Sequence, residues 1–296
     1  MTAIYEPIYR AGQTLTEPSF QPLRIETNDR AEWREFYILV EMYRRGLHRQ
    51  HLFTGLMSPK FGRKTKITGA QFLDFVRANA NSDVCFINPF PHLAYISFNG
   101  WMQGEIVHPG LMVQAQRLLD ASGVALKLAD APRQGPDVLC FCNYWVGTEK
   151  FWDQYVGGLL LPIAEFLEKN PTHPVTSSVF TPTLHTDPAP FLPFIIERLF
   201  STYLCSGIHA VKASGYPLNP TETCKNEFER QIVVHRKQAI DAADRSGIIP
   251  NLLKNEMALF CRLSRAYDRA HDTRHPHSHV GDTGPQEITS LASDVA

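Results

Sequence analysis

Short apolar segments rich in β-prone residues alternate with amphipathic segments over the first two thirds of this chain. The strand-like segments are "AIYEPIY" at 3–9, "HLFTGLM" at 51–57, "DVCFINPF" at 83–90 and "DVLCFCNYWV" at 137–146. The segments that repeat apolar side chains at helical spacing cover 30–46, 68–79, 108–123 and 147–170. Strands that alternate with helices pack in layers, so the pattern predicts an α/β fold with one central sheet.

Local signals predict where several helices begin and end. Asn28 or Asp29 is expected to cap the first helix, and Gly46 to end it. Thr148 is expected to cap the fourth helix, in which Pro162 predicts a kink. The segments without helical periodicity are expected to be two loops and a strand or irregular wall, at 10–29, 58–69 and 93–108.

An apolar helix is expected at 190–204 and a short strand at 208–213. Beyond Pro220 no further strand is expected, and the pattern predicts two amphipathic helices at 222–247 and 248–272. The last residues lack periodicity. This organisation predicts three parts, which are a sheet domain at 1–218, a helical pair at 219–271 and a disordered tail at 272–296.

The composition argues against several classes of protein. The chain has 296 residues, of which 44% are hydrophobic and 20% charged, and its formal net charge is -1. Such a balance lacks the basic field typical of nucleic-acid binding. We expect no secretory signal and no membrane span, because no apolar run reaches roughly 18 residues. Six scattered cysteines in apolar surroundings indicate reduced thiols and therefore a cytoplasmic location.

An ionisable pair lies inside the apolar helix "PFLPFIIERLFSTYL". Glu197 and Arg198 are adjacent, so their side chains point about 100° apart on a helix and do not naturally pair with each other. A buried carboxylate is costly unless it is paired. One interpretation is structural, with each charge paired elsewhere. The other is functional, with Glu197 directed into a site as a base or as a partner for a sugar hydroxyl.

Polar groups follow two of the expected strands. The loop "SPKFGRKTK" brings Lys60 and Lys64, with further cations, directly after the strand at 51–57. Ligands of open α/β sheets bind beyond strand ends, where cations suit a diphosphate; a solvated basic loop is the alternative. "NPFPH" follows the strand at 83–90, and there Asn88 and His92 could bind a ligand or form a stiff turn.

Asn143, Tyr144 and Trp145 lie where the strand at 137–146 meets the next helix. Exposed aromatic rings at such a turn stack on sugars, whereas buried rings form core, and the sequence leaves both interpretations open. The chain contains no Walker loop, GxGxxG, HExxH or nucleophile elbow.

The order of these segments resembles bacterial glycosyltransferases of capsule and lipopolysaccharide synthesis with a GT-A-like fold. The resemblance covers roughly residues 4 to 215 and is carried by "AIYEPIYR", "EWREFYILVEMYRRG", "FTGLMSPKFGRKT", "DVCFINPF", "CNYWVGTEKFWDQY" and "PFLPFIIERLFSTYL". It implies an open central sheet flanked by helices, with the C-terminal helices as an appendage. It also implies transfer of a sugar from a nucleotide-sugar donor to a growing cell-surface glycan.

The resemblance also assigns roles to particular residues. On the donor side it implies Tyr5, Arg10, Lys60, Lys64, Asn88 and His92, of which the two lysines would neutralise the diphosphate. On the acceptor side it implies Asn143, Tyr144, Trp145 and Arg198, with Glu197 as the catalytic or acceptor-orienting carboxylate. The chain lacks an Asp-x-Asp pair at the expected position, so a requirement for Mn or Mg is an open question.

Two alternatives come from other classes. The missing acidic pair suggests a non-catalytic glycan-binding or scaffold module on the same fold. A different α/β enzyme, such as a hydrolase, is disfavoured by the lack of a nucleophile elbow and of a clear pair of carboxylates. Association with the inner face of the membrane, and a homo-oligomer formed through the C-terminal helices, are further expectations.

Overall fold

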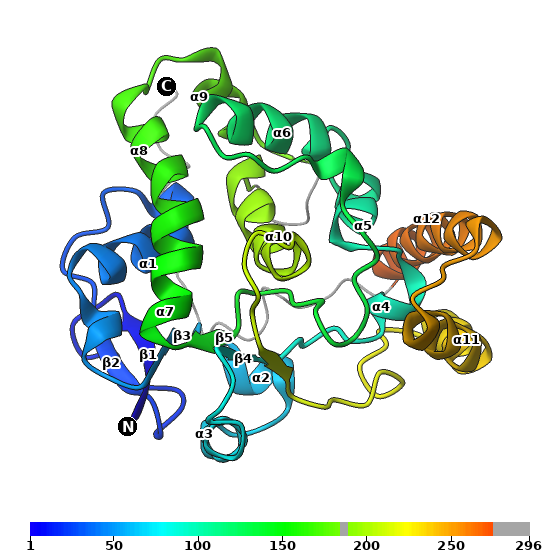
Figure 1. Cartoon of the computed structure of the whole chain (residues 1–296), viewed down its shortest axis with the longest axis horizontal. Coiled ribbons are helices and arrows are strands. Elements are labelled where there is room, and N and C mark those ends of the chain that lie inside the picture. Colours follow the sequence, from blue (N-terminus) through cyan, green and yellow to red (C-terminus); the bar gives the residue numbers. More distant parts are fainter. Residues whose placement is uncertain (184–188, 275–296) are drawn as a thin grey trace, which may run out of the picture.

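The computed structural model describes residues 1–183 and 189–274 and shows an α/β fold around a mixed sheet (Figure 1). Within these residues the sheet has six strands in the order β2-β1-β3-β5-β4-β6. The strands are β1 (Thr2–Ile8), β2 (Gln21–Arg24), β3 (Phe53–Leu56), β4 (Val84–Phe86), β5 (Trp145–Gly147) and β6 (Ala213–Gly215). β5 is antiparallel to both of its neighbours, whereas the other pairings are parallel. The start of β5 therefore lies at the same sheet edge as the carboxyl ends of the other strands.

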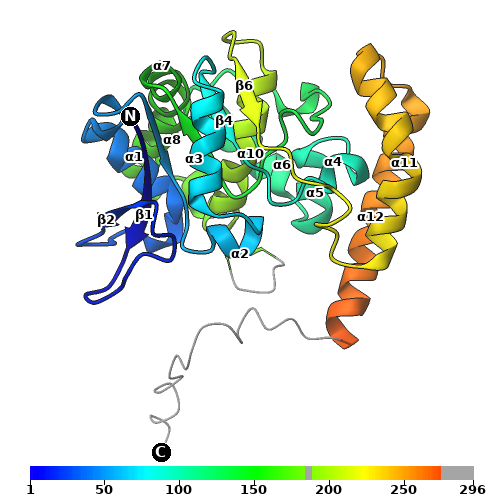
Figure 2. The ribbon, with the colours of Figure 1, turned by 90° about the horizontal axis from the view of Figure 1, so that it is seen from below.

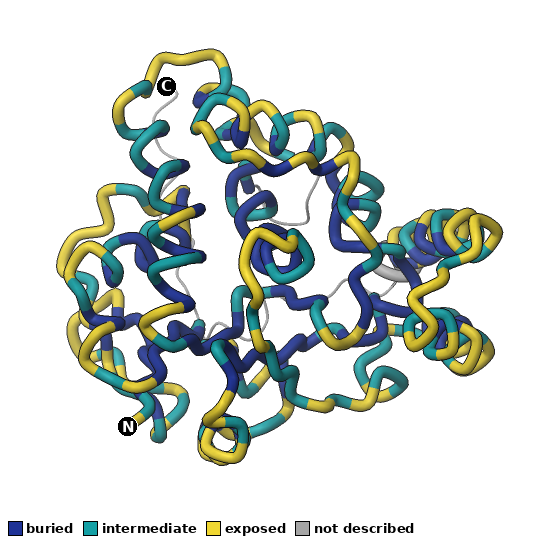
Figure 3. The backbone as a smooth tube through the Cα atoms, in the orientation of Figure 1, coloured by how far each residue is buried: buried dark blue, intermediate teal, exposed yellow. Residues whose placement is uncertain are grey.

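Helices cover both faces of this sheet, as the α/β prediction requires. One face is covered by α2 (Phe61–Thr65) and α3 (Gly69–Ala78), which pack on Ile4 and Val146 of the central strands. The larger layer on the opposite face consists of α1 (Glu35–Arg44), α6 (Leu111–Ala121), α7 (Glu149–Trp152), η4 (Asp153–Leu160), α8 (Leu161–Lys169) and α10 (Phe191–Cys205). Buried residues follow the sheet and α10 through the middle of the molecule (Figure 3).

Several predicted elements are confirmed and others are shorter than the sequence suggested. The strand "DVLCFCNYWV" contributes only β5, because Cys142 and Asn143 have positive φ angles that an extended strand cannot accommodate. The strand expected at 208–213 begins only at Ala213. Thr148 caps α7 as predicted, since its side chain accepts the N–H of Phe151.

Two expected irregular segments contain regular structure. The loop at 10–29 includes β2, an edge strand of which only Leu23 is buried, so it lacks the alternation that would have identified it. The segment 93–108 forms two helices instead of a strand, α4 (Leu93–Ile96) and α5 (Gly100–Val107). The Asn99 side chain accepts the Met102 N–H and begins α5, a cap signal that the prediction overlooked.

The predicted cap at Asn28 or Asp29 is wrong. The chain forms η1 (Ala31–Trp33), then Arg34 adopts a φ of 53° and α1 starts without a side-chain cap. The long fourth helix continues through the π-helical turns of η4, and Pro162 lies in the first turn of α8, where its missing N–H is tolerated. The remaining short helices are η2 (Leu47–Arg49), η3 (Leu128–Asp130) and α9 (Pro174–Val179).

The C-terminal helical pair is confirmed as α11 (Glu227–Ser246) and α12 (Asn251–Arg274), which lie side by side at one end of the molecule (Figure 2). Their apolar faces pack on α4 and α5 in a separate cluster that includes Tyr95, Val233 and Met257. From residue 275 onward the expected tail lies outside the described residues. Within the described residues no helix is both long enough and apolar enough to cross a bilayer.

Candidate functional site

Groups from three segments of the chain meet at the carboxyl edge of the sheet. Ser58 follows β3 after Met57, and Asn88 follows β4 after Ile87. Cys142, Asn143 and Tyr144 precede β5, which is antiparallel to both of these strands. The Ile87 N–H donates to the Tyr144 carbonyl at 2.9 Å, which brings the polar residues of the β4 and β5 ends next to one another. Sheet edges of this kind are where ligands bind in open α/β folds.

Lys64 and Glu197 converge on Cys142 at this edge. The Lys64 Nζ lies 3.1 Å from the Cys142 Sγ, and the Glu197 Oε1 accepts the Cys142 N–H at 2.8 Å. The Glu197 side chain is 22% exposed, and its Oε2 lies 3.5 Å from a terminal nitrogen of Arg198. A cation from the first half of the chain and a carboxylate from the second half therefore both contact Cys142.

Cys142 lies in a turn of unusual backbone conformation. Cys142 has a φ of 67° and Asn143 a φ of 53°, which are left-handed values for two successive residues other than glycine. Such backbone costs about 1–2 kcal/mol for a residue like Cys142, whereas asparagine tolerates it more readily. Tyr144 follows the turn, and its hydroxyl lies 2.7 Å from the Ser58 Oγ. Strained backbone that side chains hold in place is typical of functional sites.

Electrostatic interactions keep a positive charge at the turn. Burial opposes the charge of the Lys64 ammonium, whereas Cys142, Tyr144 and Glu197 raise the pKa of Lys64 above its ordinary value. Cys142 and Tyr144 have this effect only as anions, so near neutral pH the stabilising neighbour is Glu197. Burial raises the pKa of the Cys142 thiol to about 12, although Lys64 opposes this change. At neutral pH Lys64 is therefore protonated and Cys142 is a neutral thiol.

Two amides at the same edge have hydrogen-bonding atoms without partners. Asn88 is 5% exposed, and its Oδ1 accepts the Phe90 N–H at 3.0 Å while its Nδ2 has no partner among the described residues. The Oδ1 of Asn143 is likewise buried and unpartnered in that part of the chain. Buried polar atoms are nearly always satisfied, so these two are candidates for contact with water or a ligand.

Two acidic residues near this edge were not predicted from the sequence. Burial is the main cause of the raised pKa values of Cys142 and Tyr144, and Glu35 at the start of α1 adds to both. Glu6 is fully buried in β1, and its carboxylate accepts the Thr16 N–H at 2.8 Å and the Thr16 hydroxyl at 2.9 Å. A carboxylate in an otherwise apolar strand was a signal for Glu6, whereas nothing in the local sequence indicated Glu35.

Four of the residues proposed as ligand contacts have buried side chains. Trp145 is 0% exposed and packs on Phe200 and other core rings, because β5 turns it toward the larger helical layer. His92 is also 0% exposed, and its Nδ1 lies 2.9 Å from the Thr223 hydroxyl. The other two are Tyr5, which is 8% exposed in the core, and Tyr144, which is 1% exposed.

Arg198 is likewise buried, and its guanidinium is bound by protein groups. It is 3% exposed, and its Nε donates to the Gly100 carbonyl at 2.8 Å. Its terminal nitrogens donate to the Phe194 carbonyl at 2.8 Å and to the Gln103 Oε1 at 2.6 Å. Arg198 therefore joins α10 to α5 through these hydrogen bonds.

The two remaining cations of the predicted site have exposed side chains. Arg10 lies just beyond the end of β1, and Lys60 immediately precedes α2. A hollow of about 450 Å³ is lined by Ile8 and Arg24, at the carboxyl ends of β1 and β2, and by residues of the loop between these strands. Gln13, Thr14 and Leu15 of the intervening loop complete much of its wall. Because β1 is next to β3 in the sheet, this hollow lies at the same edge as Lys64.

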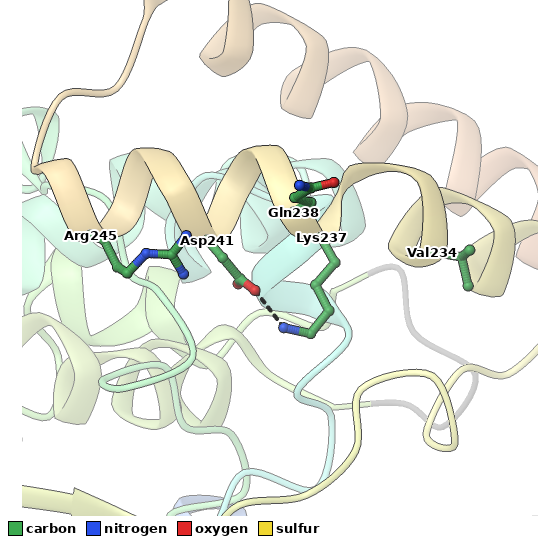
Figure 4. A pocket seen from close by; sticks show the side chains of 5 residues that line it. All are labelled: Val234, Lys237, Gln238, Asp241 and Arg245. Carbon is green, nitrogen blue, oxygen red and sulfur yellow. Dashed lines mark hydrogen bonds and ion pairs between the residues drawn. The ribbon is translucent and has the colours of Figure 1, made fainter.

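A second hollow, of about 370 Å³, lies along α11 and apart from the sheet edge (Figure 4). Its lining comes from that one helix, and Lys237 forms an ion pair with Asp241 across it at 2.5 Å. No residue of the candidate site lines this hollow. We therefore assign it no part in the site.

No group of three His, Cys, Asp or Glu side chains within the described ranges is arranged to hold a metal ion. Comparisons with protein-family models, curated proteins and solved structures find no match to this chain.

Proposed function

We propose that this protein is a nucleotide-sugar-dependent glycosyltransferase with a GT-A-like sheet, acting on a growing cell-surface glycan. The observation that carries the proposal is the convergence of Lys64 and Glu197 on Cys142 at the carboxyl edge of the sheet. Sugar transfer from a diphosphate donor calls for a fixed cation near the leaving group and for polar groups near the acceptor hydroxyl. Both kinds of group occur at this edge.

The donor is proposed to lie across the ends of β1 and β3. Its nucleotide would occupy the hollow beside Ile8 and Arg24, near Arg10, and its diphosphate would lie toward Lys60 and Lys64. Charge develops on the diphosphate as the sugar leaves. Lys64 keeps its proton at neutral pH and could stabilise that charge.

The acceptor side is proposed to be the turn that carries Asn143. Its unpartnered Oδ1, together with the Nδ2 of Asn88, offers an acceptor and a donor suited to sugar hydroxyls. We place the reaction in the cytoplasm, because all six cysteines lie in the described part of the chain as free thiols.

A second candidate function is a non-catalytic glycan-binding or scaffold module. It is favoured by the contacts of Glu197, whose carboxylate holds the Cys142 backbone and lies beside Arg198, as a purely structural acid would. This candidate predicts glycan binding without turnover of any donor.

Titration with a panel of UDP, GDP and CMP sugars tests the proposal. We expect at least one donor to bind, measured by calorimetry, and to be slowly hydrolysed, measured by release of the nucleotide. If the folded protein binds none of them, the glycosyltransferase proposal is wrong. Binding of glycans with no donor turnover would instead support the scaffold module.

A further inference from the structure

We infer that Glu197 is a positioning residue that holds the left-handed turn at Cys142 and Asn143, and that it is not the base of the reaction. The inference deepens the proposed function and rests on it for its kinetic consequences. The structural part, that Glu197 holds the turn, stands on the geometry alone.

The carboxylate of Glu197 is already engaged by the protein. Its Oε1 accepts the Cys142 N–H at 2.8 Å, which is good hydrogen-bond geometry for a charged acceptor. Its Oε2 faces the buried guanidinium of Arg198 at 3.5 Å. Both oxygens of the carboxylate are therefore directed at protein groups, which is the arrangement of a residue that holds its neighbours in place.

The turn needs such a support because two successive residues other than glycine adopt positive φ. Backbone of this kind persists only where its surroundings determine it. Glu197 holds the backbone of Cys142, Lys64 contacts its sulfur at 3.1 Å, and Ser58 holds the hydroxyl of Tyr144 at 2.7 Å. Of these three contacts, only that of Glu197 acts on the backbone of the left-handed residues.

The position of the turn determines where two groups lie on which the proposed reaction depends. The Lys64 ammonium is held against Cys142, and the unpartnered Oδ1 belongs to Asn143. A shift of the turn would displace both groups from the donor and acceptor. A displacement of about 1 Å can reduce a rate about 10²-fold. Glu197 can therefore be important for catalysis without exchanging a proton.

Glutamine separates the two roles of Glu197. In Glu197→Gln the side-chain oxygen can still accept the Cys142 N–H, but the basicity is gone, whereas Glu197→Ala removes both. Both variants lose the charge beside Arg198, so their comparison isolates the Cys142 contact. Arg198 keeps its neutral acceptors on Gly100, Phe194 and Gln103 in either variant.

We expect Glu197→Gln to keep kcat within about 5-fold of the parent and to retain the acidic limb of its pH profile, and Glu197→Ala to lose about 10²-fold. A Glu197→Gln protein that folds and yet loses as much activity as Glu197→Ala would overturn the inference. Glu165→Ala, which removes an exposed ion pair on α8, is the control that should retain full activity. If Glu197→Ala does not fold, Glu197→Gln alone decides the question.

Exchange of the Cys142 amide proton, followed by NMR, tests the structural part without any substrate. The amide should be protected in the parent and in Glu197→Gln, and should exchange at least about 10-fold faster in Glu197→Ala. Equal protection in all three proteins would contradict the inference. A parent without turnover would count against the proposed function, and the exchange measurement would still decide whether Glu197 holds the turn.

Discussion

Arg198 and Gly104 occupy adjoining space on α10 and α5, such that a Cβ added at Gly104 would collide with the Nε of Arg198. The guanidinium lies directly on the backbone of α5, where it donates to the Gly100 carbonyl at 2.8 Å. This contact explains why an arginine can lie inside the apolar helix "PFLPFIIERLFSTYL". Its charge is compensated by backbone and amide oxygens, with Glu197 nearby.

The first prediction concerns that close approach. Gly104→Ala should lower the free energy of unfolding by about 1–3 kcal/mol, because the added methyl group displaces a buried, fully engaged guanidinium. Urea denaturation measures the change. The control is Gly158→Ala, where an added Cβ meets only the Asp153 carbonyl oxygen at 3.8 Å. Equal stability of the Gly104→Ala protein and the parent would show that Arg198 can move at little cost.

The second prediction tests the charge of Lys64. Lys64→Met keeps most of the apolar stem but removes the ammonium, so affinity for the nucleotide-sugar donor should fall about 10- to 100-fold. Calorimetry at fixed salt measures the affinity, and circular dichroism checks that the variant is folded. Lys66→Met, an exposed neighbour at the end of α2, is the matched control. Similar losses in the two variants would indicate a diffuse basic loop instead of a defined contact.

The third prediction is a pH dependence of stability due to His92. Burial, with a contribution from Lys225, lowers the pKa of His92 to about 3, even though the Glu229 Oε2 lies 3.6 Å from its Nε2. The unfolded chain takes up this proton near pH 6.5, whereas the folded chain does not until about pH 3. Stability should therefore fall as the pH falls below 6.5, by at most about 1.4 kcal/mol per pH unit.

Denaturation midpoints of the parent and of His92→Asn between pH 7 and pH 4 measure this contribution. The variant should lose stability less steeply with acid than the parent does. His235→Asn, at an exposed histidine of α11, should leave the slope of the parent unchanged. Identical slopes for all three proteins would mean that His92 takes up its proton in the folded state.

The fourth prediction concerns the attachment of the C-terminal helices. Arg133 is 9% exposed, and its Nε and one terminal nitrogen each lie 3.1 Å from the carboxylate of Asp244 on α11. Its terminal nitrogens also donate to backbone carbonyls of the α4 region, including Ala94 and Ser97. Arg133→Met should destabilise the protein by about 3–5 kcal/mol, because it leaves the partly buried Asp244 without its cation.

Limited proteolysis should then cleave between the helical pair and the sheet domain faster in Arg133→Met than in the parent. Arg230→Ala removes an exposed ion pair on the same helix and should change stability by no more than about 1 kcal/mol. If Arg133→Met resists proteolysis as well as the parent, the apolar contacts of α11 and α12 are sufficient for attachment.

Local sequence signals predicted much of the fold but few details of the site. Thr68 and Gln71 form a capping box at the start of α3, and the apolar periodicity of α6 and α10 extends over whole helices. β2 was missed because an edge strand with one buried residue has no alternation. The helices α4 and α5 were missed because their apolar residues are buried against α11 and α12, which lie far away in the chain.

The sequence by itself determined the order of the longer helices and of the central strands, since hydrophobic periodicity and capping are local properties of the chain. It also showed that Lys64 and Glu197 were unusual, one in a loop after a strand and the other inside an apolar helix. Only the tertiary structure decided that the two meet at Cys142, whereas Trp145, His92 and Arg198 are buried. The physical reason is that burial and hydrogen-bond partners depend on contacts between residues far apart in sequence, which no local pattern records.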